Sequence, residues 1–110
     1  EINRIKHVLT KHPQRFLEKI FTEYERNYCR GRATQLAARF ASKEATMKAL
    51  GTGTRGVAWK EIEVQRLPSG KPFIKLHGRA KERAKFIGIK KIELSISHSK
   101  ELATAMVIMH

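Results

Sequence analysis

Residues 42–53 of the sequence, SKEATMKALGTG, bring one carboxylate, Glu44, and two cationic side chains, Lys43 and Lys48, close together. On a helical wheel at about 100° per residue, Lys43 falls inside an apolar stripe, with Arg39 and Glu44 flanking it. Charged side chains in such places cost free energy unless they are paired or bound to an ion. The segment therefore requires either structural partners for these charges or a ligand.

Two interpretations of these charges remain open. In the structural one, Glu44 pairs with Lys48 at the favourable i,i+4 spacing, while Lys43 and Arg39 extend towards solvent. In the functional one, Glu44 holds a hard cation, and the two lysines and Arg39 neutralise phosphate oxygens. Mg²⁺ is commonly held in this way, by roughly one or two carboxylates together with substrate phosphates. The pattern alone favours the structural interpretation.

The glycines of GTGTRG, residues 51–56, resemble a phosphate-binding loop only superficially. In such a loop the glycines precede a helix, so that amides at its positive end face the anion. Here the glycines follow the predicted helix, whose carboxyl end is electronegative. A phosphate bound nearby would need cationic side chains or a metal ion to attract it.

A second polar group, Ser97, His98 and Ser99, ends the predicted strand KIELSISHS. Strand alternation places His98 on the apolar face, where a histidine is more often structural. The functional alternative is a phosphate contact with imidazole N–H and serine O–H donors. The turn PSGKP has the same two interpretations, since its composition is typical of turns and its Lys71 is placed to touch a ligand. The 5 histidines show no zinc-ligand spacing.

Composition indicates one domain, 1–110, with an acidic partner. The chain has 110 residues, of which 41% are hydrophobic, enough for one core. Its 23 Lys and Arg residues against 10 Asp and Glu give a formal charge of +13. Such an excess suits nucleic acid, a phosphorylated ligand, an anionic membrane surface or an acidic protein, and composition does not choose among them.

The cysteine content and the termini add three expectations. Cys29 is the only cysteine, which excludes an intrachain disulfide and fits a reducing cytosol. No apolar run approaches the roughly 20 residues that cross a bilayer, and no signal-peptide pattern is visible. Because the chain begins with Glu1 in an already periodic segment, we expect natural N-terminal residues to precede it.

Hydrophobic periodicity predicts an α+β fold, with helices first and strand pairs later. The predicted helices are Ile2 to Leu9, Phe16 to Phe21, Thr22 to about Arg30, residues 34–50 and residues 79–88. Pro13 is expected to separate the first two, and Gly51 to end the helix over residues 34–50. The predicted strands are residues 61–66, 73–77, 91–99 and 101–110, the last two joined by a turn at Ser99 and Lys100.

The sequence closely resembles the bacterial holo-[acyl-carrier-protein] synthases, the small class of 4′-phosphopantetheinyl transferases. The resemblance is carried, in this order and spacing, by RFASKEATMKALGTG, SGKPFIKLHG and LSISHSKELATAMV. EINRI and RFLEKIFTEYERNYC match the N-terminal region of the family, so the resemblance covers essentially the whole chain.

The resemblance implies N-terminal helices followed by antiparallel strands, assembled as a homotrimer with active sites between neighbouring subunits. It implies transfer of 4′-phosphopantetheine from coenzyme A to a serine of apo-acyl carrier protein, with release of adenosine 3′,5′-bisphosphate. The implied reaction requires Mg²⁺ and serves fatty acid synthesis in the cytoplasm. Neither nucleic acid nor a membrane is an implied partner.

The resemblance also assigns roles to matching positions. Glu44 matches the metal-binding glutamate and, with Lys48, is expected to act in catalysis. The residues expected to bind coenzyme A are Arg39, Lys43, Lys48, Gly51, Gly70, Lys71, Pro72, Ser97, His98 and Ser99. Arg4 matches an arginine that grips the acidic recognition helix of the carrier protein, and Lys11 and Arg15 are expected to assist it.

One family feature falls outside residues 1–110. The family has a second metal-binding carboxylate, the aspartate of a G-x-D-[IL]-x-E run, and Glu1 matches the last residue of that run. We expect this aspartate to lie before Glu1. A chain without it is expected to bind Mg²⁺ weakly and to show little activity.

Two alternative functions remain. A non-enzymatic nucleic-acid-binding module explains the charge of +13 but leaves Glu44, GTGT and SISHS without a role. A relative that modifies carrier domains of polyketide or peptide synthesis would share every motif, and the sequence does not name the physiological carrier.

Overall fold

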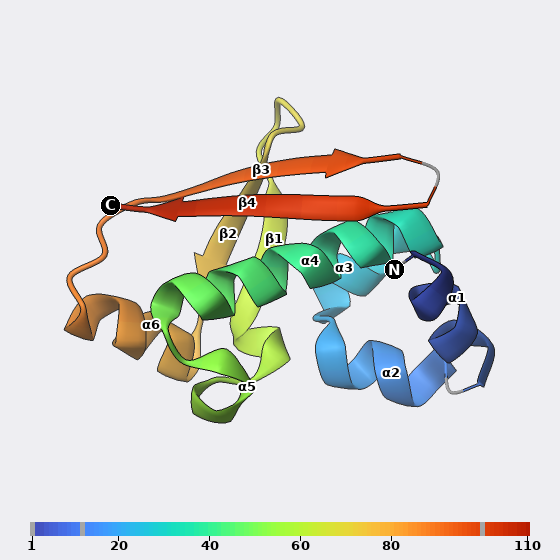
Figure 1. Cartoon of the computed structure of the whole chain (residues 1–110), viewed down its shortest axis with the longest axis horizontal. Helices are drawn as coiled ribbons and strands as arrows, with labels where there is room; N and C mark the ends of the chain where they lie inside the picture. The colour runs from blue at the N-terminus through green and yellow to red at the C-terminus, as the bar shows by residue number, and fades with distance from the viewer. Residues whose placement is uncertain (1, 12, 100) are drawn as a thin grey trace.

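The computed structural model describes residues 2–11, 13–99 and 101–110, and most of its helices precede its strands, in the predicted α+β arrangement (Figure 1). The elements in chain order are α1 (Ile2–Lys11), α2 (Pro13–Ile20), α3 (Glu23–Cys29), α4 (Ala33–Leu50), α5 (Gly53–Gly56), the 3₁₀ turn η1 (Trp59–Glu61), β1 (Ile62–Arg66), β2 (Pro72–Leu76), α6 (Gly78–Phe86), β3 (Ile92–His98) and β4 (Ala103–Met109). No helix among these described residues is long and apolar enough to cross a membrane.

The long helix α4 runs alongside the β3–β4 hairpin, with α1 and α2 near one end of the molecule and α6 at the other (Figure 1). Two apolar clusters share this helix. Its first half places Leu36 against the cluster that contains Phe21, and its second half places Leu50 in the cluster that contains Val64 and Ile74. Helix α4 therefore fixes the two halves of the chain relative to each other.

Both predicted hairpins form, each as an antiparallel pair. In the first, Val64 lies opposite Ile74, and in the second His98 lies opposite Ala103. Alternation along β3 and β4 turns one face towards α4 and the other outwards. The exposed residues of the outward face are Glu93, Ser95, Ser97, Thr104, Met106 and Ile108.

Sequence signals fix several helix ends. The predicted capping box forms at the start of α3, where the Glu25 amide donates to Thr22 Oγ1 (3.2 Å) and the Thr22 amide donates to Glu25 Oε1 (2.9 Å). Gly51 ends α4 with a left-handed φ of 75°, which glycine adopts without strain. Both predictions are confirmed.

Other boundaries differ from the predictions. Helix α2 begins at Pro13, not at Phe16, because proline suits the first helical position, where no N–H is needed. Helix α6 ends at Phe86, before the predicted stop at Gly88. Helix α5 and η1 were not predicted, since elements of 4 and 3 residues are too short to show a period. Of the predicted last turn, Lys100 lies outside the described residues.

A buried ion pair joins four elements at the middle of the chain. Lys43 Nζ lies 2.8 Å from Glu25 Oε1, and both side chains are 0% exposed. Lys43 also donates to the carbonyl oxygens of Trp59 and Ile62, and Glu25 Oε2 accepts from the amide of Val64 (2.8 Å). Burial lowers the pKa of Lys43, and the charge of Glu25 opposes that shift. The pair thus connects α3 and α4 to η1 and β1.

Replacing Lys43 by methionine is expected to lower the free energy of unfolding by about 3–5 kcal/mol, because it leaves the Glu25 carboxylate buried without a counter-charge. Urea unfolding followed by circular dichroism measures this loss. The exposed Lys60 supplies the matched control, and Lys60→Met should change the stability by less than about 0.5 kcal/mol.

The double variant Glu25→Gln/Lys43→Met should recover part of the lost stability, because it removes the unpaired charge. If Lys43→Met unfolds at the same urea concentration as Lys60→Met, the buried pair does not stabilise the fold as described.

Candidate functional site

Glu44 presents a carboxylate that the fold does not use. It is partly buried on α4, four residues before the exposed Lys48. The Glu44–Lys48 ion pair of the structural interpretation does not form within 4.0 Å, and Glu44 has no other hydrogen bond or ion pair within the described part of the chain. That interpretation is therefore wrong for Glu44, and the carboxylate remains available to a cation.

The described residues offer a Mg²⁺ ion one free carboxylate, that of Glu44, and not a complete ligand set. Within residues 2–11, 13–99 and 101–110, no group of three or more His, Cys, Asp or Glu side chains is placed to hold a metal. Mg²⁺ needs roughly one or two protein carboxylates when substrate phosphates supply further oxygens. Glu44 can be one such ligand. The second carboxylate is expected before Glu1, and this expectation falls outside the described residues.

Lys43 requires a correction. It was predicted to contact the phosphates of coenzyme A, but its side chain is 0% exposed. Its three ammonium donors are directed to Glu25, Trp59 and Ile62. The phosphate contact is therefore wrong for this conformation, because an occupied, buried ammonium group has no donor left for a ligand. The alternative of extension to solvent is wrong for the same reason.

Arg39, Pro72 and His98, which lie far apart in the sequence, line one cleft of about 270 Å³. Arg39 reaches it from α4, Pro72 from the start of β2 and His98 from the end of β3. The other lining residues are Tyr28, Gln35, Arg66 and Ile96. Three of the predicted coenzyme A residues are thus brought together by the tertiary structure.

The cleft is built to attract an anion. Arg39 is only 3% exposed, and its guanidinium lies 4.4 Å from the centre of the Tyr28 ring and donates to Gln35 Oε1 (2.7 Å). Arg66 approaches the same ring at 5.0 Å. No carboxylate occurs among the described residues that line the cleft. Buried guanidinium charge without a carboxylate is costly unless a ligand supplies the negative charge.

The two serines of SHS do not join this cleft. Ser97 lies on the outward face of β3 opposite Thr104, because alternation along the strand turns it away from His98. The Ser99 amide donates to the Leu102 carbonyl (2.8 Å) in the connection to β4. Their predicted contact with coenzyme A stays a prediction.

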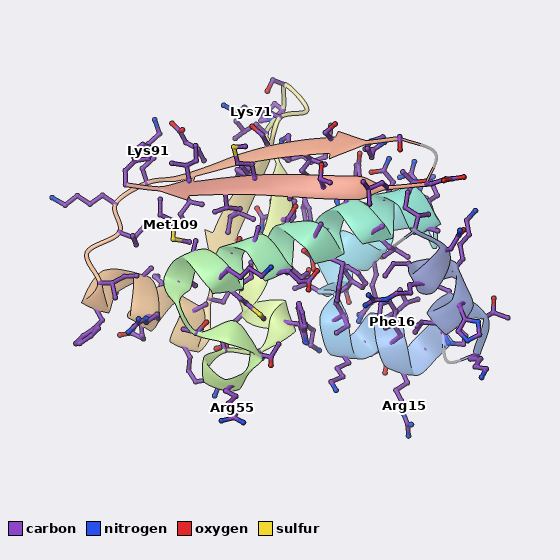
Figure 2. All side chains as sticks on the ribbon, viewed as in Figure 1. Arg15, Phe16, Arg55, Lys71, Lys91 and Met109 are labelled. Atoms are coloured by element: carbon purple, nitrogen blue, oxygen red, sulfur yellow. The ribbon has the colours of Figure 1, made fainter. Side chains whose placement is uncertain are left out.

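The β1–β2 turn and the end of α4 place the remaining predicted residues. Gly70, with a φ of 92°, closes the turn, and Lys71 lies exposed at the hairpin tip (Figure 2). The Gly51 amide donates to the Lys48 carbonyl (3.1 Å), so it caps the helix and is not free for a phosphate. Thr52 Oγ1, the next side chain, is buried without a hydrogen-bond partner among the described residues.

Arg4, Lys11 and Arg15 form an exposed basic end of the molecule. Arg4 and Lys11 lie on α1, and Arg15 lies on α2 and points away from the body of the molecule (Figure 2). Their predicted contact with an acidic carrier stays a prediction.

Sequence reasoning missed several contributors to the site. Tyr28, Gln35 and Arg66 complete the anion cleft, and Glu25 neutralises Lys43. The i,i+4 spacing of Gln35 and Arg39 was visible in the sequence, but nothing there showed that Tyr28 or Arg66 would meet them. These contacts depend on how α3 and β1 pack.

The predicted site is divided within one chain. Glu44 follows Arg39 by five residues, which at about 100° per residue places their side chains roughly 140° apart around α4. Neither Glu44 nor Lys48 lines the Arg39 cleft. One chain thus offers a free carboxylate with a lysine on one side of α4 and an anion cleft on another.

Comparison with known proteins gives consistent results. A model of the 4′-phosphopantetheinyl transferase superfamily matches residues 1–107. The holo-[acyl-carrier-protein] synthase of Halothermothrix orenii is 45% identical over 111 residues, which are 98% of this chain and 89% of that protein.

Solved structures agree over the same length. The Helicobacter pylori holo-[acyl-carrier-protein] synthase in complex with coenzyme A has a TM-score of 0.89 at 30% identity, covering 99% of this chain and 93% of that chain. The Bacillus anthracis synthase in complex with coenzyme A (3′,5′-ADP) has a TM-score of 0.79 at 39% identity, covering 99% and 88%. The resemblance found in the sequence is confirmed: this chain belongs to the 4′-phosphopantetheinyl transferase superfamily, among the holo-[acyl-carrier-protein] synthases.

Proposed function

We propose that this protein transfers 4′-phosphopantetheine from coenzyme A to a serine of an apo-acyl carrier protein. The observation that supports this most directly is the anion cleft of Arg39, Arg66 and His98, in a chain whose full-length relatives include synthases solved with coenzyme A. Glu44 stands at the position where the family resemblance predicts a metal ligand, and its carboxylate is free to bind one.

The proposed chemistry is a phosphoryl transfer in which one P–O bond replaces another. The serine oxygen of the carrier attacks the β-phosphate of coenzyme A, and the pyrophosphate bond breaks, releasing adenosine 3′,5′-bisphosphate. Arg39 and His98 hold phosphate oxygens, and Lys48 adds positive charge beside the carboxylate of Glu44. Glu44, acting through a water molecule, is the candidate acceptor for the serine proton.

Glu44 would hold Mg²⁺, together with oxygens from the substrate and the carboxylate expected before Glu1. When bound, Mg²⁺ neutralises charge on the pyrophosphate and orients it for displacement. A role in fatty acid synthesis in the cytoplasm, with Mg²⁺ as the cofactor, completes the proposal.

We further propose a homotrimer with active sites between subunits. The division of the site within one chain supports this, because the cleft of one copy and the Glu44–Lys48 side of another would together form a complete set. The outward face of β3–β4 offers a contact surface, on which Met106 is 63% and Ile108 46% exposed.

Replacing Glu44 by glutamine should abolish transfer while leaving the fold intact, because the amide is isosteric but binds Mg²⁺ poorly. Intact-mass analysis of apo-acyl carrier protein, incubated with coenzyme A, Mg²⁺ and enzyme, reports the added phosphopantetheine. We expect a loss of at least about 100-fold in rate, and Lys60→Gln serves as the exposed control. Full activity of Glu44→Gln would remove the carboxylate from the mechanism.

Transfer at limiting carrier concentration should slow as salt rises, because the exposed basic end steers an acidic partner. Arg4→Ala and Arg15→Ala should raise the KM for the carrier several-fold with little change in kcat. Lys91→Ala, at the opposite end of the molecule (Figure 2), should change neither. If the KM for the carrier is independent of salt and of both the Arg4 and the Arg15 substitution, the carrier does not bind at this end.

Placing a glutamate at Met106 should separate the subunits, because it buries like charges around the proposed threefold contact. The double variant Thr104→Glu/Met106→Glu places a second charge on the same face, and it should give a monomer with reduced transfer. Light scattering measures the mass of each variant. A variant of unchanged mass would exclude this face as the contact.

The nucleic-acid-binding alternative makes a different prediction. Tight binding of nucleic acid, without any phosphopantetheine added to the carrier protein, would favour it.

A further inference from the structure

A cleft of about 440 Å³ lies between β2, α6 and the start of β3, and none of its lining residues belongs to the proposed transfer site. Its floor is apolar and formed by Ile74, Leu76, Ala84, Ile89 and Ile92. Its rim is formed by five exposed lysines, namely Lys75, Lys81, Lys85, Lys90 and Lys91, so we call it the lysine cleft. Such a site combines an apolar base with a ring of positive charge.

The fold leaves most of this charge uncompensated. Lys85 lies 4.0 Å from Glu82 and Lys91 lies 3.1 Å from Glu93, but these pairs are well exposed and therefore weak. The other three lysines have no carboxylate within 4.0 Å in the described part of the chain. Among the residues that the structure describes, none that lines the cleft is acidic. The lysine cleft consequently attracts anions.

Two exposed apolar side chains lie at the end of α6, the helix that contributes Lys81, Ala84 and Lys85 to the cleft. Phe86 follows Lys85 at the end of α6 and is 83% exposed, and Ile87 after it is 37% exposed. Single exposed apolar residues are normal. The Phe86 ring lies 5.9 Å from the guanidinium of Arg83, so an exposed aromatic side chain and a cation occupy the same end of the molecule as the lysine cleft. Basic side chains together with exposed aromatic ones suit an anionic membrane surface.

We propose that the lysine cleft and Phe86 bind the surface of a membrane that contains anionic phospholipid. Headgroup phosphates contact the rim lysines, while Phe86 and Ile87 enter the region between headgroups and acyl chains. Nucleic acid would satisfy the lysines but leave the apolar floor and Phe86 in water. An anionic lipid surface satisfies both.

The position of the cleft is compatible with the rest of the molecule. Lys91 and α6 lie at one end of the longest axis, and Arg15 lies towards the other (Figure 2). The longest extent of the chain is 40 Å, so a surface that touches α6 leaves the end with α1 accessible. The proposed membrane site uses no residue of the transfer site. Membrane binding and phosphopantetheine transfer can therefore be tested independently.

Sedimentation with sucrose-loaded vesicles tests the proposal on the full chain. We expect the protein to pellet with vesicles of phosphatidylcholine and phosphatidylglycerol, and not with vesicles of phosphatidylcholine alone. Added salt should weaken the binding but leave a residual part that depends on Phe86. Equal binding to both vesicle types, or no binding to either, would overturn the proposal.

Two variants separate insertion from simple attraction. Phe86→Ser should weaken partition by about tenfold, because it removes most of the inserted apolar area. The triple variant Lys81→Gln/Lys85→Gln/Lys90→Gln should weaken it by roughly fivefold per lysine, or about 100-fold in all. The charge-matched control Lys19→Gln/Arg55→Gln/Lys60→Gln should lose less than about threefold, since its charges lie elsewhere on the molecule.

A spectroscopic variant reports insertion without relying on lost binding. Phe86→Trp should show a blue-shifted emission with anionic vesicles, quenched by brominated acyl chains. Unchanged carrier transfer in solution would show that each variant is folded. General electrostatic attraction replaces the proposed site if the control loses as much binding as the lysine variant. The same conclusion follows if the Phe86→Trp variant pellets with vesicles but the fluorescence of the new tryptophan shows neither a blue shift nor quenching by brominated acyl chains.

Discussion

The ion pair between Lys43 and Glu25 is the constraint on which the middle of the structure depends. Both side chains are fully buried, and their remaining hydrogen-bonding capacity is directed to backbone groups of η1 and β1. An apolar contact would bury similar area without direction, whereas each of these bonds requires a defined distance and angle. The pair thereby fixes where β1 starts relative to α4, and with it the hairpin that carries Pro72 into the anion cleft. One charged residue in the KEA motif thus supports the fold while its neighbour, Glu44, is left free for chemistry.

Helix α4 separates these two tasks by geometry alone. Adjacent residues on a helix point roughly 100° apart, so Lys43 faces the core while Glu44 lies at its edge. Arg39 is turned to another side again, where Tyr28 and Arg66 supply its surroundings without a carboxylate. A chain arranged in this way presents two partial sites with different chemistry. The proposed homotrimer would bring these two partial sites together from neighbouring subunits.

The positive charge of the chain is likewise divided among distinct surfaces. The α1–α2 end carries exposed cations with little apolar surface, which suits an acidic protein. The lysine cleft combines cations with an apolar floor and the protruding Phe86, which suits a lipid surface. The anion cleft buries its arginine almost completely, which suits a small phosphate-bearing ligand. The positive charge of the chain, +13 in net, therefore lies on three kinds of surface. They differ in how much apolar surface lies next to the cationic side chains.

Local patterns in the sequence determined the α+β order, the Thr22 capping box, the stop at Gly51 and both hairpins, because each depends on residues a few positions apart. The ordered motifs also determined the family, with Glu44, Arg39 and His98 among the candidate residues. Only the tertiary structure decided which charges are available. It paired Lys43 with Glu25 from another helix and brought Arg39 to Tyr28 and His98, because packing in three dimensions sets the solvation and partners of a side chain. Periodicity places a charge on a face of a helix, but the element that covers that face determines whether the charge holds the fold together or meets a ligand.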